Sequence, residues 1–528
     1  MDTVTQPQGR TRSRPLAALA GLLAAGLTLG IAHLAAAVID PPASPLAALG
    51  DTFIDLTPEW LKEAAIATFG LNDKLALGVG MVVVVALLAA LTGVVARVRF
   101  AVGQAVIVLL GVVAGVAAAT RPETGPLAPV PSLLGAIAGM LALKVLIGRL
   151  PASAQPADLG SATTAAPEPR PVGASRRVFL QTAMAVGVGA ALSAAAGSIV
   201  AGARSTATAV RNIVLPRAAR IAPPVQTDAQ SPVAGVVDVV TANKDFYRID
   251  TAFTIPQVDP DSWELRVHGL VDREIRLTFD ELLARDLVES YVTLTCVSNQ
   301  VGGGLAGNAK WLGLPVREVL AMAGPQAGAD MVLSRSADGF TASTPLEALT
   351  DDRDSLLAIA MNGEPLPAAH GSPVRMVVPG LYGYVSATKW VVDLEVTRFA
   401  DAEAYWTVRG WSELGPIKTA SRIEVPAAGS TVPAGPVDVG GTAWAQHTGI
   451  VGVEVQVDDG PWETATLGGE ISVDTWRQWS WRWPDASTGR HRLRVRAADA
   501  ANGVQTEDEA PVIPDGATGW HEIEVTVD

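Results

Sequence analysis

The chain has two halves with different hydrophobic patterns. In the first half, apolar runs of about 20 residues recur with few charges inside them, which is the length that crosses a bilayer as a helix. After about residue 205 the apolar runs become short and alternate with polar residues, as in strands that bury one face. The pattern predicts a helical membrane bundle followed by a β-rich part. The apolar runs are Leu16–Ile39, Leu75–Ala96, Ala101–Thr120, Ser132–Ile147 and a weaker, Ala/Gly-rich run at Val178–Ala203.

Basic residues between these runs indicate their orientation. Arg10, Arg12 and Arg14 precede the first run, and Arg97 and Arg99 follow the second, so the positive-inside rule places both segments in the cytoplasm. The acidic segment 40–73 is expected outside, with a short interfacial helix at Pro58–Phe69. The loop 121–131 is also expected outside, and 149–177 inside. A fifth span then leaves the rest of the chain outside.

The segment before the fifth run adds an export prediction. Ser175-Arg176-Arg177-Val178-Phe179-Leu180-Gln181 resembles a twin-arginine export signal, although an ordinary stop-transfer flank is the alternative. Such a route would explain why Arg204, Arg211, Arg217 and Arg220 lie on the side that the positive-inside rule disfavours. Ala201-Gly202-Ala203 also resembles a signal-peptidase site, and cleavage there would release the following domain.

Composition narrows the function. The 528 residues suffice for about three folding units, and the mean hydropathy of +0.30 averages an apolar first half with an acidic second half. The net charge of −14 argues against a nucleic-acid partner, because phosphate neutralisation needs clustered Lys and Arg.

One cysteine is the first chemical candidate. Cys296 lies in Leu294-Thr295-Cys296-Val297-Ser298-Asn299-Gln300-Val301-Gly302-Gly303-Gly304, where an apolar β-rich run meets a Gly-rich turn. A lone cysteine forms no internal disulfide, so it is a buried core thiol, a nucleophile or a metal ligand.

Several polar residues stand at predicted loop–strand junctions downstream. A helix is predicted to begin at Thr278, with Glu281 completing a capping box, and strands are predicted around Asp338-Gly339. His370, Arg375 and Lys389 follow. Taken singly, each could be an ordinary surface residue or a buried residue whose polar atoms have hydrogen-bond partners. Together they could form a cradle for an anionic group.

The last part of the chain has the pattern of an all-β sandwich. Val451–Asp458, Trp479–Trp483 and Arg492–Arg496 alternate strictly and are separated by turn signals such as Asp459-Gly460-Pro461 and Asn502-Gly503. The tryptophan stripe is expected to be core rather than a ligand platform.

The cysteine loop resembles that of the sulfite-oxidase family of molybdenum enzymes, and the resemblance continues through Met361-Asn362-Gly363-Glu364-Pro365-Leu366-Pro367 and His370–Lys389. It implies that Cys296 binds the molybdenum of a molybdopterin cofactor. It also implies cofactor contacts from Tyr247 and Arg248 on an N-terminal strand, and from His370, Arg375, Ser386, Thr388 and Lys389. The following sandwich resembles the family's dimerisation domain.

Departures from the family pattern make sulfite doubtful as the substrate. Ile359 stands where animal and plant sulfite oxidases have an active-site tyrosine, and Gln300 and Val301 replace cationic residues that help to bind sulfite. Sulfite is a dianion, so a pocket without a cation binds it poorly, unless Arg335 or Arg409 reaches the site. The bacterial methionine-sulfoxide reductase branch lacks the Gly triplet of this loop.

These observations predict a multi-domain chain: an α-helical transmembrane bundle, an α+β molybdopterin domain and an all-β immunoglobulin-like sandwich. The expected divisions are 1–150 with four membrane helices, a cytoplasmic linker at 151–177, a fifth helix at 178–203, a tether at 204–232, the oxidoreductase domain at 233–402 and the sandwich at 403–528.

The predicted function is a multi-pass, membrane-anchored molybdenum oxidoreductase whose catalytic domain faces outside and acts on a small substrate. With His33 the one histidine in the spans and no further cysteine, no haem or iron–sulfur cluster is expected in this chain. Electrons would then pass to or from a separate protein or quinone-linked partner. Homodimerisation through the sandwich is also expected. The alternative is a non-catalytic cell-surface binding module with a degenerate molybdopterin fold.

Overall fold

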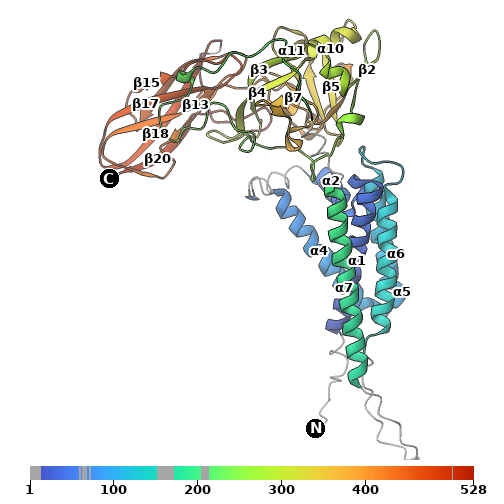
Figure 1. Ribbon diagram of the computed structural model, residues 1–528. Coiled ribbons are helices and arrows are strands. Elements are labelled where there is room, and N and C mark those ends of the chain that lie inside the picture. The colour runs from blue at the N-terminus through green and yellow to red at the C-terminus, as the bar shows by residue number, and fades with distance from the viewer. Residues whose placement is uncertain are drawn as a thin grey trace, which may run out of the picture. The chain divides into compact units, whose positions relative to one another are not determined.

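The computed structural model describes residues 14–58, 61, 68–69, 73–151, 172–203, 213–501 and 503–528 (Figure 1). The chain divides into two compact units: Met1–Ser205 with Thr251–Thr254, and Thr206–Asp250 with Ile255–Asp528. The expectations for Arg10, Arg12, Arg204, Arg211 and Asn502, and for most of the interfacial helix at 58–69, lie outside the described residues.

The first unit is helical, and five of its helices are long and apolar enough to cross a membrane. The helix α2 was not predicted; Pro45 at its first turn suits a helix start, because its missing N–H would have no intrahelical partner there. The helices of the first unit are α1 (Arg14–Ile39), η2 (Pro41–Ala43), α2 (Pro45–Leu56), α4 (Asp73–Ala96), α5 (Phe100–Ala119), α6 (Pro129–Gly148) and α7 (Val172–Ala203).

Small residues let these helices approach closely. A Cβ added at Gly30 of α1 would lie 2.7 Å from the Ala190 carbonyl of α7, and one at Gly135 of α6 would lie 2.4 Å from the Thr28 carbonyl of α1. Such contacts are typical of membrane helices, which gain little from hydrophobic burial in lipid and associate through close packing. The helix α1 therefore packs against both α6 and α7.

The second unit begins with an α+β domain built on two sheets. One sheet has the strand order β2-β1-β10-β5-β6, and the other has the order β3-β4-β7-β8 with β9 paired to β7. The elements are β1 (Glu264–Gly269), β2 (Ile275–Thr278), α9 (Phe279–Leu283), β3 (Val288–Thr295), β4 (Ala306–Pro315), α10 (Val316–Ala323), β5 (Met331–Ser336), β6 (Thr341–Pro345), α11 (Leu346–Thr350), β7 (Leu356–Met361), β8 (Glu364–Pro365), β9 (Arg375–Val377), α12 (Gly383–Ser386) and β10 (Val391–Thr397), with 3₁₀ turns η4 (Thr227–Ala229), η5 (Pro260–Ser262), η6 (Ala368–His370) and η7 (Thr407–Arg409).

Local signals in this domain are confirmed. Thr278 caps α9, and its side chain and that of Glu281 form the predicted reciprocal capping box. The strands predicted around Asp338-Gly339 are β5 and β6, which pair antiparallel. The N-terminal strand expected to carry Tyr247 and Arg248 was wrong: residues 241–250 form turns and irregular backbone.

The C-terminal domain is a two-sheet sandwich. Its sheets have the orders β11-β13-β17-β16 and β12-β20-β18-β14-β15, with β19 on β18. Trp479, Trp481 and Trp483 lie in the core, as predicted. Its strands are β11 (Ala420–Val425), β12 (Thr431–Val432), β13 (Gly435–Trp444), β14 (Ile450–Val457), β15 (Trp462–Thr464), β16 (Thr466–Leu467), β17 (Arg477–Ala486), β18 (Gly489–Asp499), β19 (Gly503–Val504) and β20 (His521–Val527).

A small shared core joins the α+β domain to the sandwich. Val239 and Ala306 pack with Trp444 and Trp476, and the Trp476 indole N–H donates to the Val239 carbonyl at 2.9 Å. Buried aromatic side chains with a satisfied N–H contribute strongly to such contacts. The three predicted parts are therefore all present: apolar helices, a central domain with two sheets and an all-β domain.

Candidate active site

Cys296 begins a closed loop between β3 and β4. Its backbone N–H donates to the Leu305 carbonyl at 3.0 Å, which closes the base of the loop. Inside the loop, Asn299 Oδ1 accepts from the Leu305 N–H at 2.8 Å. A Cβ at Gly303 would lie 2.5 Å from that same Oδ1, so the loop requires glycine at this position. The Gly triplet therefore serves a compact loop that fixes the cysteine.

The Cys296 thiol is buried, with 9% of the residue exposed. Burial raises the pKa of the thiol, while hydrogen bonds from the backbone and side chain of Ser298 and the charge of Lys389 lower it. These three contacts favour the thiolate, which is the form that binds a metal. A cation at the sulfur would offset the remaining cost of burying that charge.

Arg375, on β9, is a buried cation that contacts neutral acceptors. Its guanidinium donates to the carbonyls of His370 at 3.2 Å, Met376 at 3.3 Å and Ala387 at 3.4 Å, and it lies 5.2 Å from the Trp311 ring. Within the described part of the chain, no carboxylate forms an ion pair with it. Burial lowers its pKa to about 10. A buried charge without a counterion is costly, so this position favours an anionic ligand.

Lys389 and Arg248 share one carboxylate. Lys389 Nζ and Arg248 Nε lie 2.7 Å and 2.8 Å from Asp250 Oδ2. Burial lowers the pKa of Lys389 to about 8, and the charge of Asp250 opposes that shift. Asp338 also lies near this group: burial and the charge of Asp250 raise its pKa, and the charge of Lys389 lowers it.

His370 lies at the end of η6, next to this group. Its Nε2 is 3.1 Å from the Asn243 carbonyl, so the tautomer with a proton on Nε2 satisfies this contact and leaves Nδ1 as an acceptor. Burial, followed by the charge of Arg375, lowers the His370 pKa to about 4, which keeps the ring neutral near pH 7. A Cβ at Gly371, whose φ is 110°, would lie 2.9 Å from Arg375 Cβ and 3.0 Å from Lys389 Cβ. Glycine therefore allows the three side chains to converge.

Two tyrosines lie near the thiol. Burial raises the pKa of Tyr247, with a further increase from the charge of Cys296 and a decrease from that of Arg375. Burial also raises the pKa of Tyr382 to about 12, with smaller effects that include Cys296. Both phenols therefore stay protonated and can donate hydrogen bonds.

The predicted hydroxyl ligands Ser386 and Thr388 point into the protein. The Ser386 hydroxyl donates to the Tyr382 carbonyl at 2.9 Å, and that of Thr388 lies 2.7 Å from Ser334 Oγ. Neither residue is exposed to solvent. They stabilise the segment that carries Lys389, and their hydroxyls already have protein partners.

The positions that depart from the family pattern carry no charge toward the thiol. Ile359 is fully buried in the hydrophobic core, Gln300 is exposed and Val301 is 37% exposed. Arg335 is exposed on β5. Arg409 donates to the Tyr405 carbonyl at 2.6 Å and lies 3.6 Å from that ring.

The sandwich supports the loop from its other side. Arg422 Nη1 donates to the Gly303 carbonyl at 2.9 Å, and Gln446 Nε2 donates to Thr295 Oγ1 at 2.8 Å. A Cβ at Gly302 would lie 2.1 Å from His521 Cδ2, so β20 packs directly on the loop. The loop is therefore built between two domains.

Electrostatic contacts thus connect six of the predicted site residues: Tyr247, Arg248, Cys296, His370, Arg375 and Lys389. Asp250, Ser298 and Tyr382 were missed. For Asp250, the spacing of two residues after Arg248 was an available signal, since such side chains can meet in irregular backbone.

Comparisons with known proteins match both β-rich domains of the second unit. The family description "Oxidoreductase molybdopterin binding domain" matches residues 252–406, and "Bacterial Ig domain" matches residues 421–495. Human mitochondrial sulfite oxidase is 30% identical over 327 residues, which is 52% of this chain and 59% of that protein. The chain thus spans less than two thirds of the length of that relative.

A shorter relative is matched over more of its length. The uncharacterized oxidoreductase YuiH of Bacillus subtilis is 34% identical over 157 residues, covering 30% of this chain and 76% of that protein. Among solved structures, the sulfane dehydrogenase SoxCD of Paracoccus pantotrophus gives a TM-score of 0.46 at 23% identity, over 52% of this chain and 79% of that one. By its matched domain, its relatives and its cysteine loop, the chain belongs to the sulfite-oxidase family of molybdopterin-dependent oxidoreductases.

Proposed function

We propose that this protein is a membrane-anchored, extracytoplasmic molybdenum-cofactor oxidoreductase that carries out oxygen-atom or two-electron transfer on a small substrate. The observation that carries the proposal is the buried Arg375 guanidinium, which forms no ion pair with a described carboxylate and lies in one electrostatic group with the Cys296 thiol. A thiolate for a metal and a cation for an anionic cofactor are the two features that such a group needs.

The residues fit the cofactor in distinct roles. Cys296 would bind the metal, and Arg375 and Lys389 would bind the anionic part of the pterin. Arg248, which shares Asp250 with Lys389, would add positive charge nearby. His370 presents a neutral Nδ1 acceptor, and the protonated Tyr247 presents a donor. When bound, the molybdenum centre supplies the two-electron chemistry, while the protein supplies position and charge.

Metal analysis of the purified full chain tests this proposal. We expect about one molybdenum per chain in the wild type and little in Cys296→Ser, with an unchanged circular dichroism spectrum. Asp438→Asn, an exposed position on β13, is a control that should keep the metal. A folded wild type without molybdenum, when produced in cells that make the cofactor, would instead favour the non-catalytic binding module.

The proposed location rests on the helical unit. Most of the basic residues lie toward one end of the helices: Arg97, Arg99, Arg149, Arg176 and Arg177. The other end carries Asp40, Asp51, Asp55 and Glu123 together with Lys74 and with Arg121, which is paired with Asp55. This distribution supports a cytoplasmic basic end and, after five spans, an outward catalytic domain. Electrons would then pass to or from a separate redox partner, and the sandwich could mediate homodimerisation.

The export route has its own test. Changing both Arg176 and Arg177 to Lys keeps the positive charge, so a stop-transfer flank should tolerate it, whereas a twin-arginine receptor should not. We expect the catalytic domain of this double variant to stay protected from protease added outside spheroplasts. Normal accessibility would show that the arginine pair is incidental.

A further inference from the structure

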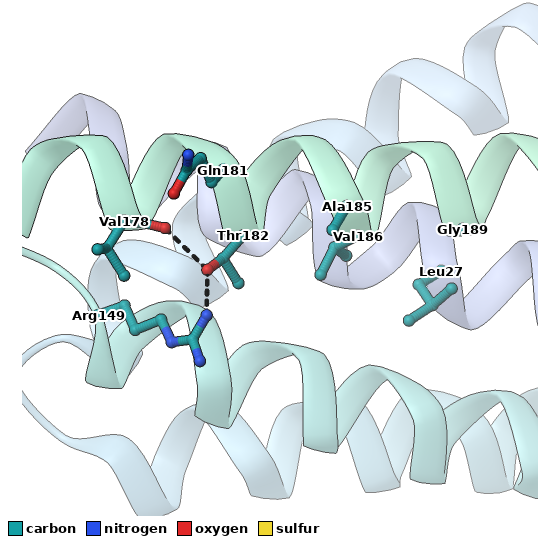
Figure 2. Close-up of a pocket in the computed structure, with 8 residues that line it drawn as sticks. All are labelled: Leu27, Arg149, Val178, Gln181, Thr182, Ala185, Val186 and Gly189. Carbon is teal, nitrogen blue, oxygen red and sulfur yellow. Dashed lines mark hydrogen bonds between the residues drawn. The ribbon is translucent and has the colours of Figure 1, made fainter.

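A groove of about 450 Å³ lies in the helical unit, at the end where α6 stops and α7 starts (Figure 2). Arg149, directly after α6, lines one end together with Gln181 and Thr182 of α7. The rest of the groove is apolar and runs along α7, with Leu27 of α1 opposite Gly189. The remaining lining residues are Val178, Ala185 and Val186.

A neutral hydroxyl orients the cation at the polar end. Arg149 Nη1 donates to Thr182 Oγ1, whose own proton is donated to the Val178 carbonyl at 2.8 Å, as Figure 2 shows. The ion pairs of the described residues include none with Arg149. Among the described residues of this unit, its charge is therefore not neutralised.

The other charged residues of the helical unit are also divided unevenly between the two helix ends. Lys144, Arg176 and Arg177 are exposed near the same helix ends. The carboxylates in the described segments 14–58, 73–151 and 172–203 all belong to the opposite helix ends. Val178, Gln181 and Ala185 are exposed, so the groove opens on the outside of the bundle. A ligand here must combine an anionic head with an apolar tail.

We propose that this groove binds one anionic phospholipid, with its phosphodiester at Arg149 and an acyl chain along Val178, Ala185 and Gly189. The inference rests on the proposed insertion of the bundle into a membrane. The guanidinium can donate two N–H groups to phosphate oxygens, and Gln181 can add a third donor. Basic grooves between membrane helices on the cytoplasmic side are suited to such headgroups.

Native mass spectrometry of the full chain, released from detergent and titrated with lipid, tests the site. We expect one phosphatidylglycerol to bind at least about tenfold more tightly than phosphatidylcholine. Arg149→Gln should remove most of this preference. Arg99→Gln, which removes the same charge from the same end of the bundle, should leave it within about twofold. Ala185→Phe, which fills the apolar part, should weaken both lipids.

Several results would overturn the site. Equal binding of the two lipids, or an unchanged preference in Arg149→Gln, would exclude a phosphodiester contact at Arg149. Competition by soluble glycerol phosphate as strong as by the lipid would mean that the acyl part contributes nothing. Displacement by a quinone but not by phosphatidylglycerol would assign the groove to a different ligand.

Two further measurements separate this inference from the proposed function. Carbonate extraction of membranes reports whether the bundle is inserted, and molybdenum content reports the catalytic domain. A wild type that resists extraction and holds molybdenum, with lipid binding unaffected by Arg149→Gln, would reject the lipid site alone. Loss of the wild type from carbonate-washed membranes would reject membrane insertion itself.

Discussion

Two buried arginines, one in each β-rich domain of the second unit, differ in how their charge is balanced. Arg422 in the sandwich is 6% exposed and lies 2.7 Å from Glu424. Arg375 in the α+β domain is 5% exposed but contacts carbonyl oxygens, and burial lowers its pKa to about 10. Arg422 is therefore neutralised within the fold, whereas Arg375 keeps an uncompensated charge. The difference indicates that the first arginine serves the structure and the second serves a ligand.

The largest expected effect comes from Arg375→Met. Losing a charge-assisted contact to a buried anion costs about 2–4 kcal/mol, so the affinity for the cofactor should fall at least about 30-fold and the molybdenum content should fall with it. The cofactor-free protein should melt at the same or a higher temperature, because an unpaired buried cation is removed. Metal analysis and calorimetry measure the two effects.

Arg422→Met is the matched control for this comparison, since it removes the same side chain from a similarly buried position. Without the cofactor, this variant should melt at a lower temperature than the cofactor-free wild type. If Arg375→Met also lowers that melting temperature as much as Arg422→Met does, the two arginines are alike and the comparison fails.

The next effect concerns sulfite, and it extends the comparison to the positions that depart from the family pattern. The cations of the cradle are buried around the thiol, whereas Ile359, Gln300 and Val301 carry no charge. Each lost contact to a desolvated anion costs about 30- to 1,000-fold in binding or rate, so sulfite turnover should be weak. Steady-state oxidation by metal-replete protein with an artificial acceptor measures it. A kcat/KM above about 10⁵ M⁻¹s⁻¹ would contradict this expectation.

Breaking the neutralised pair should cost stability. Arg422→Met leaves Glu424 buried without its cation, which should lower the free energy of unfolding by about 3–5 kcal/mol. The double variant Arg422→Met with Glu424→Gln should recover most of that loss, because no buried charge remains. Chemical denaturation of the four proteins of this cycle gives the coupling energy. Additive losses would show that the pair is not coupled.

The smallest effect is a pH dependence in the sandwich. Burial lowers the pKa of His521 to about 4, from an ordinary value near 6.5, and its Nδ1 accepts the Ile423 N–H at 2.9 Å. The unfolded chain therefore takes up the proton first as the pH falls, so this residue loses stabilisation between about pH 6.5 and pH 4. The loss should be about 2 kcal/mol by pH 5.

His521→Asn tests that dependence, because its amide oxygen can replace the acceptor without titrating. Its unfolding free energy should fall less steeply over the same pH range than that of the wild type. His370, whose pKa is also lowered to about 4, remains in both proteins and contributes equally. Identical slopes would exclude His521 as a source of the pH dependence.

Features that depend on residues close together in the sequence could be predicted. The capping box of Thr278 and Glu281 and the alternating strands of the sandwich depend on neighbours in the chain, and both are present. The grouping of His370, Arg375 and Lys389 was likewise foreseen, because they flank one short strand and the loops beside it.

The remaining features depend on contacts between distant segments. Asp250 meets Lys389, and Arg422 meets Gly303, across large separations that no local pattern encodes. The inward hydroxyl of Thr388 also depends on its partner Ser334, which comes from another strand. Tyr247 and Arg248 were expected on a strand, but their segment is held in turns and irregular backbone by tertiary contacts such as those of Asn243 and Phe246.

The position of the Cys296 loop between two domains also constrains how the protein matures. The loop takes support from Arg422 of β11 and from His521 of β20, and both strands are synthesised long after Cys296 leaves the ribosome. A nascent chain that ends before β20 therefore has a thiol without its finished surroundings. We expect the cofactor to be held stably only after both strands have been synthesised and packed on the loop, so the α+β domain alone should not retain it.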